Sequence, residues 1–236
     1  MSGVCPRPPA SAGALRAAPA VLPIDTVLVR FHSPRFGALS FNPNVGPSGA
    51  PRDIDRPEDG ARFSPFSDDL GANVPTLYAG TTEYAAALES VFHDVPHVPD
   101  PPFPNSKLGH FVLSHFSVVR PLSVLELVNS QLRQFPVAGR AHSLLEAEIV
   151  HSDPRQYPMT RRWAQYFYNG IPTLQGLAWR PRLGGEGISY VLFGDRVARS
   201  DLHSAGPPIP IDSGLGYSLM KQIAAAAHID LVCTAS

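Results

Sequence analysis

Hydrophobic and polar residues alternate with a period of two in several short segments of the chain, and this pattern predicts β-strands. The clearest segment is IDTVLVRFH at residues 24–32, which is rich in β-branched side chains and forms the first predicted strand. Other short apolar segments predict further strands at residues 74–79, 111–119, 122–128, 176–180 and 188–193.

Apolar residues with helical spacing predict a smaller set of helices. Ala85, Leu88 and Phe92 form an apolar stripe, and Thr81 or Thr82 is suited to cap the helix, which we expect to end at about Phe92. Three other helices are expected, over TRRWAQYFYN at 160–169 with Gly170 as its stop, over 143–150 and over the Ala-rich segment 219–228.

Long Pro- and Gly-rich connections separate these elements, and the chain has 26 prolines. Residues 37–73 show no periodicity, and a loop of this length is usually functional or disordered. Residues 1–22 offer little to bury and predict a flexible N-terminal arm. Neither an internal repeat nor a linker divides the rest, so we expect one α+β domain over residues 23–236, with short helices around a split, twisted β core.

Composition narrows the class of protein. Apolar residues make up 44% of the 236 residues, which is enough for a globular core. The formal net charge of −1 argues against a surface that coats nucleic acid. Cys5 and Cys233 belong to no CxxC pair, so the sequence supports neither a zinc site nor a disulfide framework. With no signal-peptide pattern and no apolar stretch of membrane-spanning length, we expect a cytoplasmic protein that binds no membrane.

Common catalytic motifs are missing from the sequence, which contains no P-loop, no HExxH and no GxSxG. GLGYSL at residues 214–219 lacks the third glycine of a dinucleotide loop, and we interpret it as a turn before a helix. His93 and His97 are four residues apart, but Pro96 breaks the helix that would align them on a metal. We therefore expect no metal site.

Four residues follow one another in an order that has chemical meaning: Arg30, Arg62, Tyr78 and Glu89. Each alone has an ordinary structural explanation as a surface charge or a packing residue. Glu89, however, borders the apolar stripe of its helix and does not lie opposite it. A carboxylate at such an edge can face a cleft.

Together the four residues match what cleavage of the nicotinamide–ribose bond of NAD requires. Nicotinamide leaves as a neutral molecule, so its departure needs no general acid. A fixed carboxylate stabilises the oxocarbenium-like ribose. Arginine forks bind the pyrophosphate, and an aromatic ring can stack on the nicotinamide. This chemistry uses no metal and no cofactor beyond NAD as substrate.

The order V-R-F-H, G-x-R-F, L-Y-A-G and A-x-x-x-E resembles the RES domain, a family named for its Arg, Glu and Ser. The similarity continues through YPMTRRWA (157–164), QGLAWRPRLGG (175–185) and VLFGDR (191–196), and so spans residues 24–196. The resemblance implies a fold like that of ADP-ribosyltransferases and an enzyme that degrades NAD with water or phosphate as acceptor. It also implies a toxin of a bacterial toxin–antitoxin pair, with an Xre-like helix-turn-helix antitoxin as partner.

The resemblance also assigns residues. It maps the family's first Arg to Arg30, its second to Arg62, its Tyr to Tyr78 and its Glu to Glu89. Glu89, Arg30 and Tyr78 are then the expected catalytic residues. The expected NAD-binding residues are Arg30, Arg62, Phe63, Tyr78 and Arg182.

Two positions depart from the family pattern. Ser64 stands where the family usually has Asn, and the family's late Y-x-S-R segment reads Trp179-Arg180-Pro181-Arg182, so that Pro181 replaces the eponymous Ser. Proline has neither a hydroxyl nor an N–H, and we expect Ser189 or Arg182 to compensate.

Two other functions remain open at this stage. A protein ADP-ribosyltransferase would use the same NAD pocket with a macromolecular acceptor. A non-catalytic NAD-binding module would bind without turnover. Association into a homodimer is also left open, because the sequence does not indicate the oligomeric state.

Overall fold

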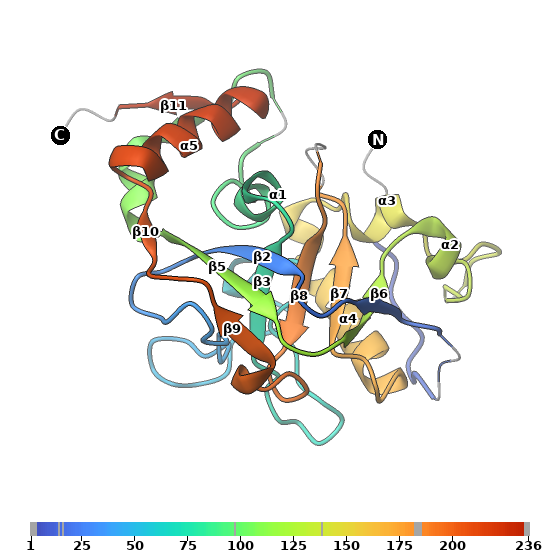
Figure 1. Ribbon diagram of the computed structural model, residues 1–236. Coiled ribbons are helices and arrows are strands. Elements are labelled where there is room, and N and C mark those ends of the chain that lie inside the picture. Colours follow the sequence, from blue (N-terminus) through green and yellow to red (C-terminus); the bar gives the residue numbers. More distant parts are fainter. Residues whose placement is uncertain are drawn as a thin grey trace.

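The computed structural model of the protein describes residues 4–13, 15, 17–96, 98–137, 139–181 and 186–233 (Figure 1). Nine strands form one large sheet in the order β1-β6-β7-β8-β3-β2-β5-β10, and β9 also pairs with β5. These strands are β1 (Ala20–Leu22), β2 (Val27–His32), β3 (Thr76–Gly80), β5 (Val112–Val118), β6 (Leu122–Glu126), β7 (Gly176–Trp179), β8 (Ser189–Phe193), β9 (Leu202–Ser204) and β10 (Ile209–Pro210).

Short helices surround this sheet. They are α1 (Glu83–Leu88), α2 (Asn129–Leu132), α3 (Glu146–Ile149), α4 (Tyr157–Gly170) and α5 (Gly214–Ala226), with 3₁₀ turns η1 (Pro57–Asp59), η2 (Asn105–His110), η3 (Pro154–Gln156) and η4 (Arg199–Asp201). A small parallel pair, β4 (Pro102–Pro104) and β11 (Asp230–Val232), lies beside α5 (Figure 1). No helix in the described ranges combines the length and the apolar character that a membrane crossing needs.

The large sheet curls where β2 meets β3. β2 pairs with β5 over its whole length, from Val27 to His32, but it pairs with β3 only through Val29 and Gly80. Figure 1 accordingly shows β2 and β5 running across the direction of β3 and β8. The expectation of a mixed α+β domain with a twisted core and short helices is confirmed, with the two parts of the core joined in one curled sheet.

Alternation along the strands divides the core between the two faces of this sheet. On β2, Val29 and Phe31 belong to the cluster that α1 and α5 cover, whereas Leu28 belongs to the cluster on the opposite face. The longest helix, α4, covers β6, β7 and β8 through a third cluster that contains Trp163 and Phe167. α1 and α4 therefore lie over neighbouring parts of one face, and the site described below lies between them.

α1 approaches β3 closely because small residues meet at the contact. A Cβ atom at Gly80 would lie 2.7 Å from the backbone N of Ala86, and Ala85, Ala86 and Ala87 are all buried. The helix begins at the expected cap, since the Thr82 hydroxyl accepts a hydrogen bond of 3.1 Å from the N–H of Ala85.

Most predicted elements are present, with different ends. The predicted strands are found, and the helix predicted to reach Phe92 ends at Leu88. The segment interpreted as a turn at 214–219 instead forms the first turns of α5. No sequence pattern predicts β1, β4, β9, β10 and β11, which are two or three residues long and depend on partners far away in the chain.

The described part of residues 1–22, expected to be a flexible arm, packs against the domain. Cys5 is buried beside α4, and the Trp163 indole donates a hydrogen bond of 2.7 Å to the carbonyl of Pro6. Further along, the N–H of Leu15 donates to the carbonyl of Gly170 at 2.9 Å, and β1 pairs with β6. The few apolar residues of this segment thus complete the core around α4.

We predict that Gly80→Ala lowers the free energy of unfolding by about 1–3 kcal/mol, because the added methyl group overlaps the backbone of α1. Urea unfolding followed by circular dichroism measures this. Gly46→Ala is the matched control: its Cβ would meet nothing closer than the Ala50 carbonyl at 3.8 Å. An equal effect of both substitutions would contradict the close contact between β3 and α1.

Candidate active site

Arg62 lies in a turn that α4 holds in place. The Thr160 hydroxyl donates to the carbonyl of Arg62, and the guanidinium of Arg161 donates to four carbonyls between residues 54 and 61. The turn itself is tight, since a Cβ atom at Gly60 would lie 2.4 Å from the Ser64 carbonyl. The segments GARFSP and YPMTRRWA therefore form one structural unit, although about 100 residues separate them.

The Arg62 side chain is only 4% exposed and is surrounded by polar partners. Its Nη1 donates to the carbonyl of Val150 and to Ser152, and the guanidinium lies 5.4 Å from the centre of the Tyr157 ring. Its Nε lies 3.7 Å from Oε2 of Glu89 and makes no hydrogen bond with any residue that the structure describes. The guanidinium is thus held by the protein on one side and faces a carboxylate on the other.

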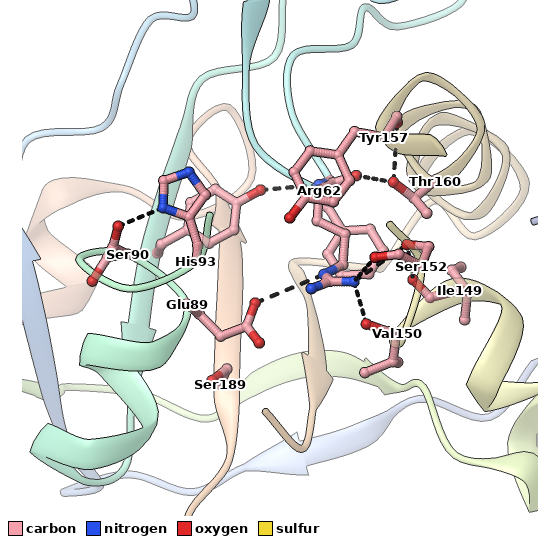
Figure 2. Close-up of polar contacts among 12 residues, drawn as sticks. Arg62, Glu89, Ser90, His93, Ile149, Val150, Ser152, Tyr157, Thr160 and Ser189 are labelled. Atoms are coloured by element: carbon pink, nitrogen blue, oxygen red, sulfur yellow. Dashed lines mark hydrogen bonds and ion pairs between the residues drawn. The ribbon is translucent and has the colours of Figure 1, made fainter. Parts of the chain in front are cut away.

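Glu89 is the C-cap residue that directly follows α1, and its side chain is 8% exposed. Figure 2 shows its carboxylate turned toward Arg62, with Ser189 nearby on β8. A carboxylate at the C-terminal end of a helix faces carbonyl oxygens, which disfavour negative charge. Arg62 supplies the opposite charge that this buried position needs.

Tyr78 contacts the turn that carries Arg62. Its hydroxyl accepts a hydrogen bond of 3.1 Å from the N–H of Phe63 and lies 3.2 Å from the hydroxyl of Ser64. Burial raises the pKa of Tyr78 to about 12, and the nearby charge of Glu89 acts in the same direction. Tyr78 therefore stays a neutral phenol near neutral pH. Behind it, the Trp179 ring lies 6.2 Å from the Tyr78 ring and 4.9 Å from the Phe63 ring.

The cluster of Arg62, Tyr78 and Glu89 lies on the α1 side of the sheet. Tyr78 pairs with Val191 on β8, and both residues belong to the α4 cluster. Two residues earlier on β8, the Ser189 hydroxyl donates a hydrogen bond of 3.3 Å to the carbonyl of Ala85 in α1. Side chains on this face can therefore meet the end of α1.

Arg30 does not join this cluster, because it projects from the opposite face. It alternates with Val29 on β2, which faces α1, and its Nη1 donates to the carbonyls of Ala38 and Ser40 at 2.9 and 2.7 Å. The side chain is 6% exposed, and burial lowers its pKa to about 10. In this structure Arg30 holds the loop that follows β2, and the expectation that it shares a pocket with Glu89 is not met.

The other residues singled out from the sequence are either buried near the cluster or lie outside the described residues. Phe63 is buried in the wall of the cluster, and Pro181 is buried just after β7. Ser189, suggested as a compensating hydroxyl, is buried against α1. Arg182, together with His97 of the weak metal pair, lies outside the described residues.

His93 lies next to the cluster, on the Glu89 side (Figure 2). Its two ring nitrogens lie 2.6 Å from the Ser90 carbonyl and 2.9 Å from the Asp94 carboxylate. Burial lowers the pKa of His93, but Asp94, the Ser90 carbonyl and Glu89 together raise it above its ordinary value. Sequence reasoning considered this histidine only as a metal ligand, and the described residues contain no group of three His, Cys, Asp or Glu side chains that could hold a metal.

The charged side chains of the cluster are largely buried, with Arg62 4% and Glu89 8% exposed, whereas Tyr78 is partly buried. The largest cavity that we describe, about 820 Å³, lies between residues 7–13 and α4, away from Glu89. A smaller cavity of about 210 Å³ begins at Ser90 and His93, next to Glu89.

The fold and the site together define an α+β domain that buries an arginine–carboxylate pair beside a neutral tyrosine. The chain belongs to the RES domain family, whose model matches residues 27–212. RES domains are generally linked to NAD-related toxin function. No curated protein matches the chain.

We predict that Thr160→Val lowers the free energy of unfolding by about 1–3 kcal/mol, because the buried carbonyl of Arg62 loses its hydroxyl partner. The control is Thr26→Val, which removes an exposed hydrogen bond of 2.7 Å to the Pro23 carbonyl and should change stability by less than about 0.5 kcal/mol. Chemical denaturation of both variants measures the difference. A neutral Thr160→Val would show that the Arg62 turn does not depend on α4.

Proposed function

We propose that the protein is an enzyme that cleaves the nicotinamide–ribose bond of NAD, with water or phosphate as acceptor, on an ADP-ribosyltransferase-like fold. The observation that supports this most directly is the buried pair of Arg62 and Glu89, 3.7 Å apart, beside Tyr78. Membership of the RES domain family is in accord with an enzyme that acts on NAD.

In this proposal, Glu89 stabilises the transition state. As the bond breaks, positive charge moves from the nicotinamide ring to the ribose, and nicotinamide leaves as a neutral molecule. A carboxylate held in a buried, preorganised position favours that charge more strongly than a carboxylate in water does. In the free protein, Arg62 places a positive charge 3.7 Å from this carboxylate.

Arg62 also binds the anionic part of the substrate. Its Nη1 is taken up by Val150 and Ser152, whereas its Nε has no hydrogen bond among the described residues. In this proposal, Glu89 turns toward the ribose when NAD binds, and that edge of the guanidinium then takes a pyrophosphate oxygen. Tyr78 remains protonated and supplies an aromatic face and a hydroxyl, so it acts as a binding residue and not as a base.

The products of the reaction identify the molecule that accepts the ADP-ribosyl group. Release of free nicotinamide without added protein indicates transfer to water, and acceleration by phosphate indicates phosphorolysis. A requirement for an added protein would indicate an ADP-ribosyltransferase. Tight NAD binding without turnover would indicate a binding module.

The biological role that fits the family is that of a toxin that depletes NAD and is held inactive by an Xre-like antitoxin. If this role is correct, the wild-type protein should arrest a bacterial host and lower its NAD content. The Glu89→Gln variant, produced at the same level, should do neither.

We predict that Glu89→Gln lowers the rate of nicotinamide release by about 100- to 1,000-fold, because the amide keeps the shape of the side chain but not its charge. The assay measures free nicotinamide with and without a chelator, which we expect to leave the wild-type rate unchanged. The control is Glu83→Gln at the other end of α1, where the carboxylate is 40% exposed. A Glu89→Gln rate close to wild type would place the reaction elsewhere.

We predict different effects for the two arginines. Arg62→Ala should weaken NAD binding by about 2–5 kcal/mol, and lysine should rescue it poorly because it cannot bind two oxygens at once. Arg30→Ala should mainly lower stability, since it frees the carbonyls of Ala38 and Ser40. Calorimetric NAD titration and thermal unfolding separate the two effects. An equally large loss of affinity in a fully stable Arg30→Ala protein would show that Arg30 contacts NAD.

A further inference from the structure

The two tryptophans of the chain are both buried, but their indole N–H groups have different surroundings. Nε1 of Trp163 donates to the Pro6 carbonyl at 2.7 Å. Nε1 of Trp179, whose side chain is 1% exposed, has no hydrogen-bond partner among the residues that the structure describes. Buried indole N–H groups usually find an acceptor, because an unmet buried donor costs free energy. The environment of Trp179 therefore needs an explanation.

Trp179 belongs to the wall of the candidate site. It is the last residue of β7, and its ring contacts the Phe63 ring edge-on at 4.9 Å and lies 6.2 Å from the Tyr78 ring. On the neighbouring strand it pairs with Ser189, whose hydroxyl donates to the carbonyl of Ala85 in α1. The indole therefore lies in the layer between the sheet and α1, the helix that Glu89 caps.

A second unmet donor lies in the same cluster. Within the described ranges, three buried side-chain polar atoms make no hydrogen bond: Nε of Arg62, Nε1 of Trp179 and Oδ1 of Asn105. The third is an acceptor in η2, a separate part of the protein. The two donors both adjoin Phe63 and Tyr78, and Arg62 already has Glu89 as its opposite charge. The indole N–H is then the donor of this cluster that has neither a hydrogen bond nor a counter-charge.

We propose that Trp179 is a substrate-binding residue whose indole N–H donates a hydrogen bond to the carboxamide oxygen of the nicotinamide ring. This inference rests on the proposed cleavage of NAD. An indole N–H can only donate, so its partner must be an acceptor. Of the two flat, aromatic parts of NAD, the nicotinamide carries the bond on which Glu89 acts in the proposed function, and its acceptor is the carboxamide oxygen. An aromatic ring of this kind suits a wall made of Phe63, Tyr78 and Trp179. Pro181, two residues further on, offers neither a hydroxyl nor an N–H for this contact.

The first test is Trp179→Phe, which keeps an aromatic ring and removes the N–H. The KM for NAD should rise about 3- to 10-fold, the effect of one neutral hydrogen bond, while kcat changes little because the contact exists before the bond breaks. The control is Trp163→Phe, which removes an equally buried indole. It should lower the Tm more than Trp179→Phe does, because it also breaks the bond to Pro6, and it should leave the KM unchanged. An unchanged KM in Trp179→Phe overturns the proposal.

The second test assigns the oxygen. Thionicotinamide adenine dinucleotide carries sulfur, a weak acceptor, in place of the carboxamide oxygen. If the indole binds this oxygen, the preference of the wild-type enzyme for NAD over the thio analogue should fall about 3- to 10-fold in Trp179→Phe. A preference that is equal in both proteins overturns the assignment to the carboxamide.

A binding measurement separates this proposal from the proposed function. If the wild-type protein releases no nicotinamide from NAD, the proposed function fails, and the indole can still be tested with nicotinamide alone. The two indole N–H signals in a nitrogen-15 spectrum are assigned with the two Phe variants. A downfield shift of the Trp179 signal on addition of nicotinamide supports the contact, and an unchanged signal overturns it.

If Trp179→Phe does not fold, another variant can be used for the KM measurement. Incorporation of benzothienylalanine into the Trp163→Phe variant replaces only the ring at position 179, with sulfur in place of the N–H and nearly the same volume. The same rise in KM supports the proposal, and an unchanged KM overturns it.

Discussion

The burial of the Arg62 guanidinium is the constraint on which the rest of the site depends. A cation removed from water must find acceptors and opposite charge within the protein. Here the carbonyl of Val150 and Ser152 supply acceptors, the Tyr157 ring supplies an aromatic face, and Glu89 supplies the charge. These partners come from the segment after α3, the start of α4 and the end of α1. One charged side chain thus fixes the relative positions of three helices.

α4 also fixes the backbone of the segment that leads into Arg62. Thr160 and Arg161 bind carbonyls of the segment that leads into Arg62, so a long polar loop is held by hydrogen bonds and not by apolar burial. The other end of α4 is held in a similar way. Arg196 donates to the carbonyls of Ile171 and Leu174 and stacks on the Tyr168 ring at 3.4 Å. Segments of the RES match that are far apart in sequence are therefore joined by arginines that donate to backbone carbonyls.

The sequence was sufficient to predict the strands and helix ends that depend on a local pattern of residues. Alternation predicted β2, a short apolar segment predicted β3, and a cap at Thr81 or Thr82 predicted the start of α1. What it could not supply was the choice of face. The period of two on β2 separates Arg30 from Val29 but does not say which of them meets α1, because that depends on how distant helices pack. The donor role of Arg161 and the unmet N–H of Trp179 were also hidden, since they depend on backbone segments folded from elsewhere.

The packing of the N-terminal segment has a consequence for how the protein can be observed. Cys5 is buried next to the cluster, burial raises its pKa to about 12, and the charges of Glu148 and Arg62 act on its thiol in opposite directions. Cys233 is exposed. A thiol reagent therefore meets one open cysteine and one that reacts only when the segment lifts away from α4. The labelling rate of Cys5 therefore reports how often this segment opens, and the labelling rate of Cys233 in the same molecule gives the reference for an unprotected thiol.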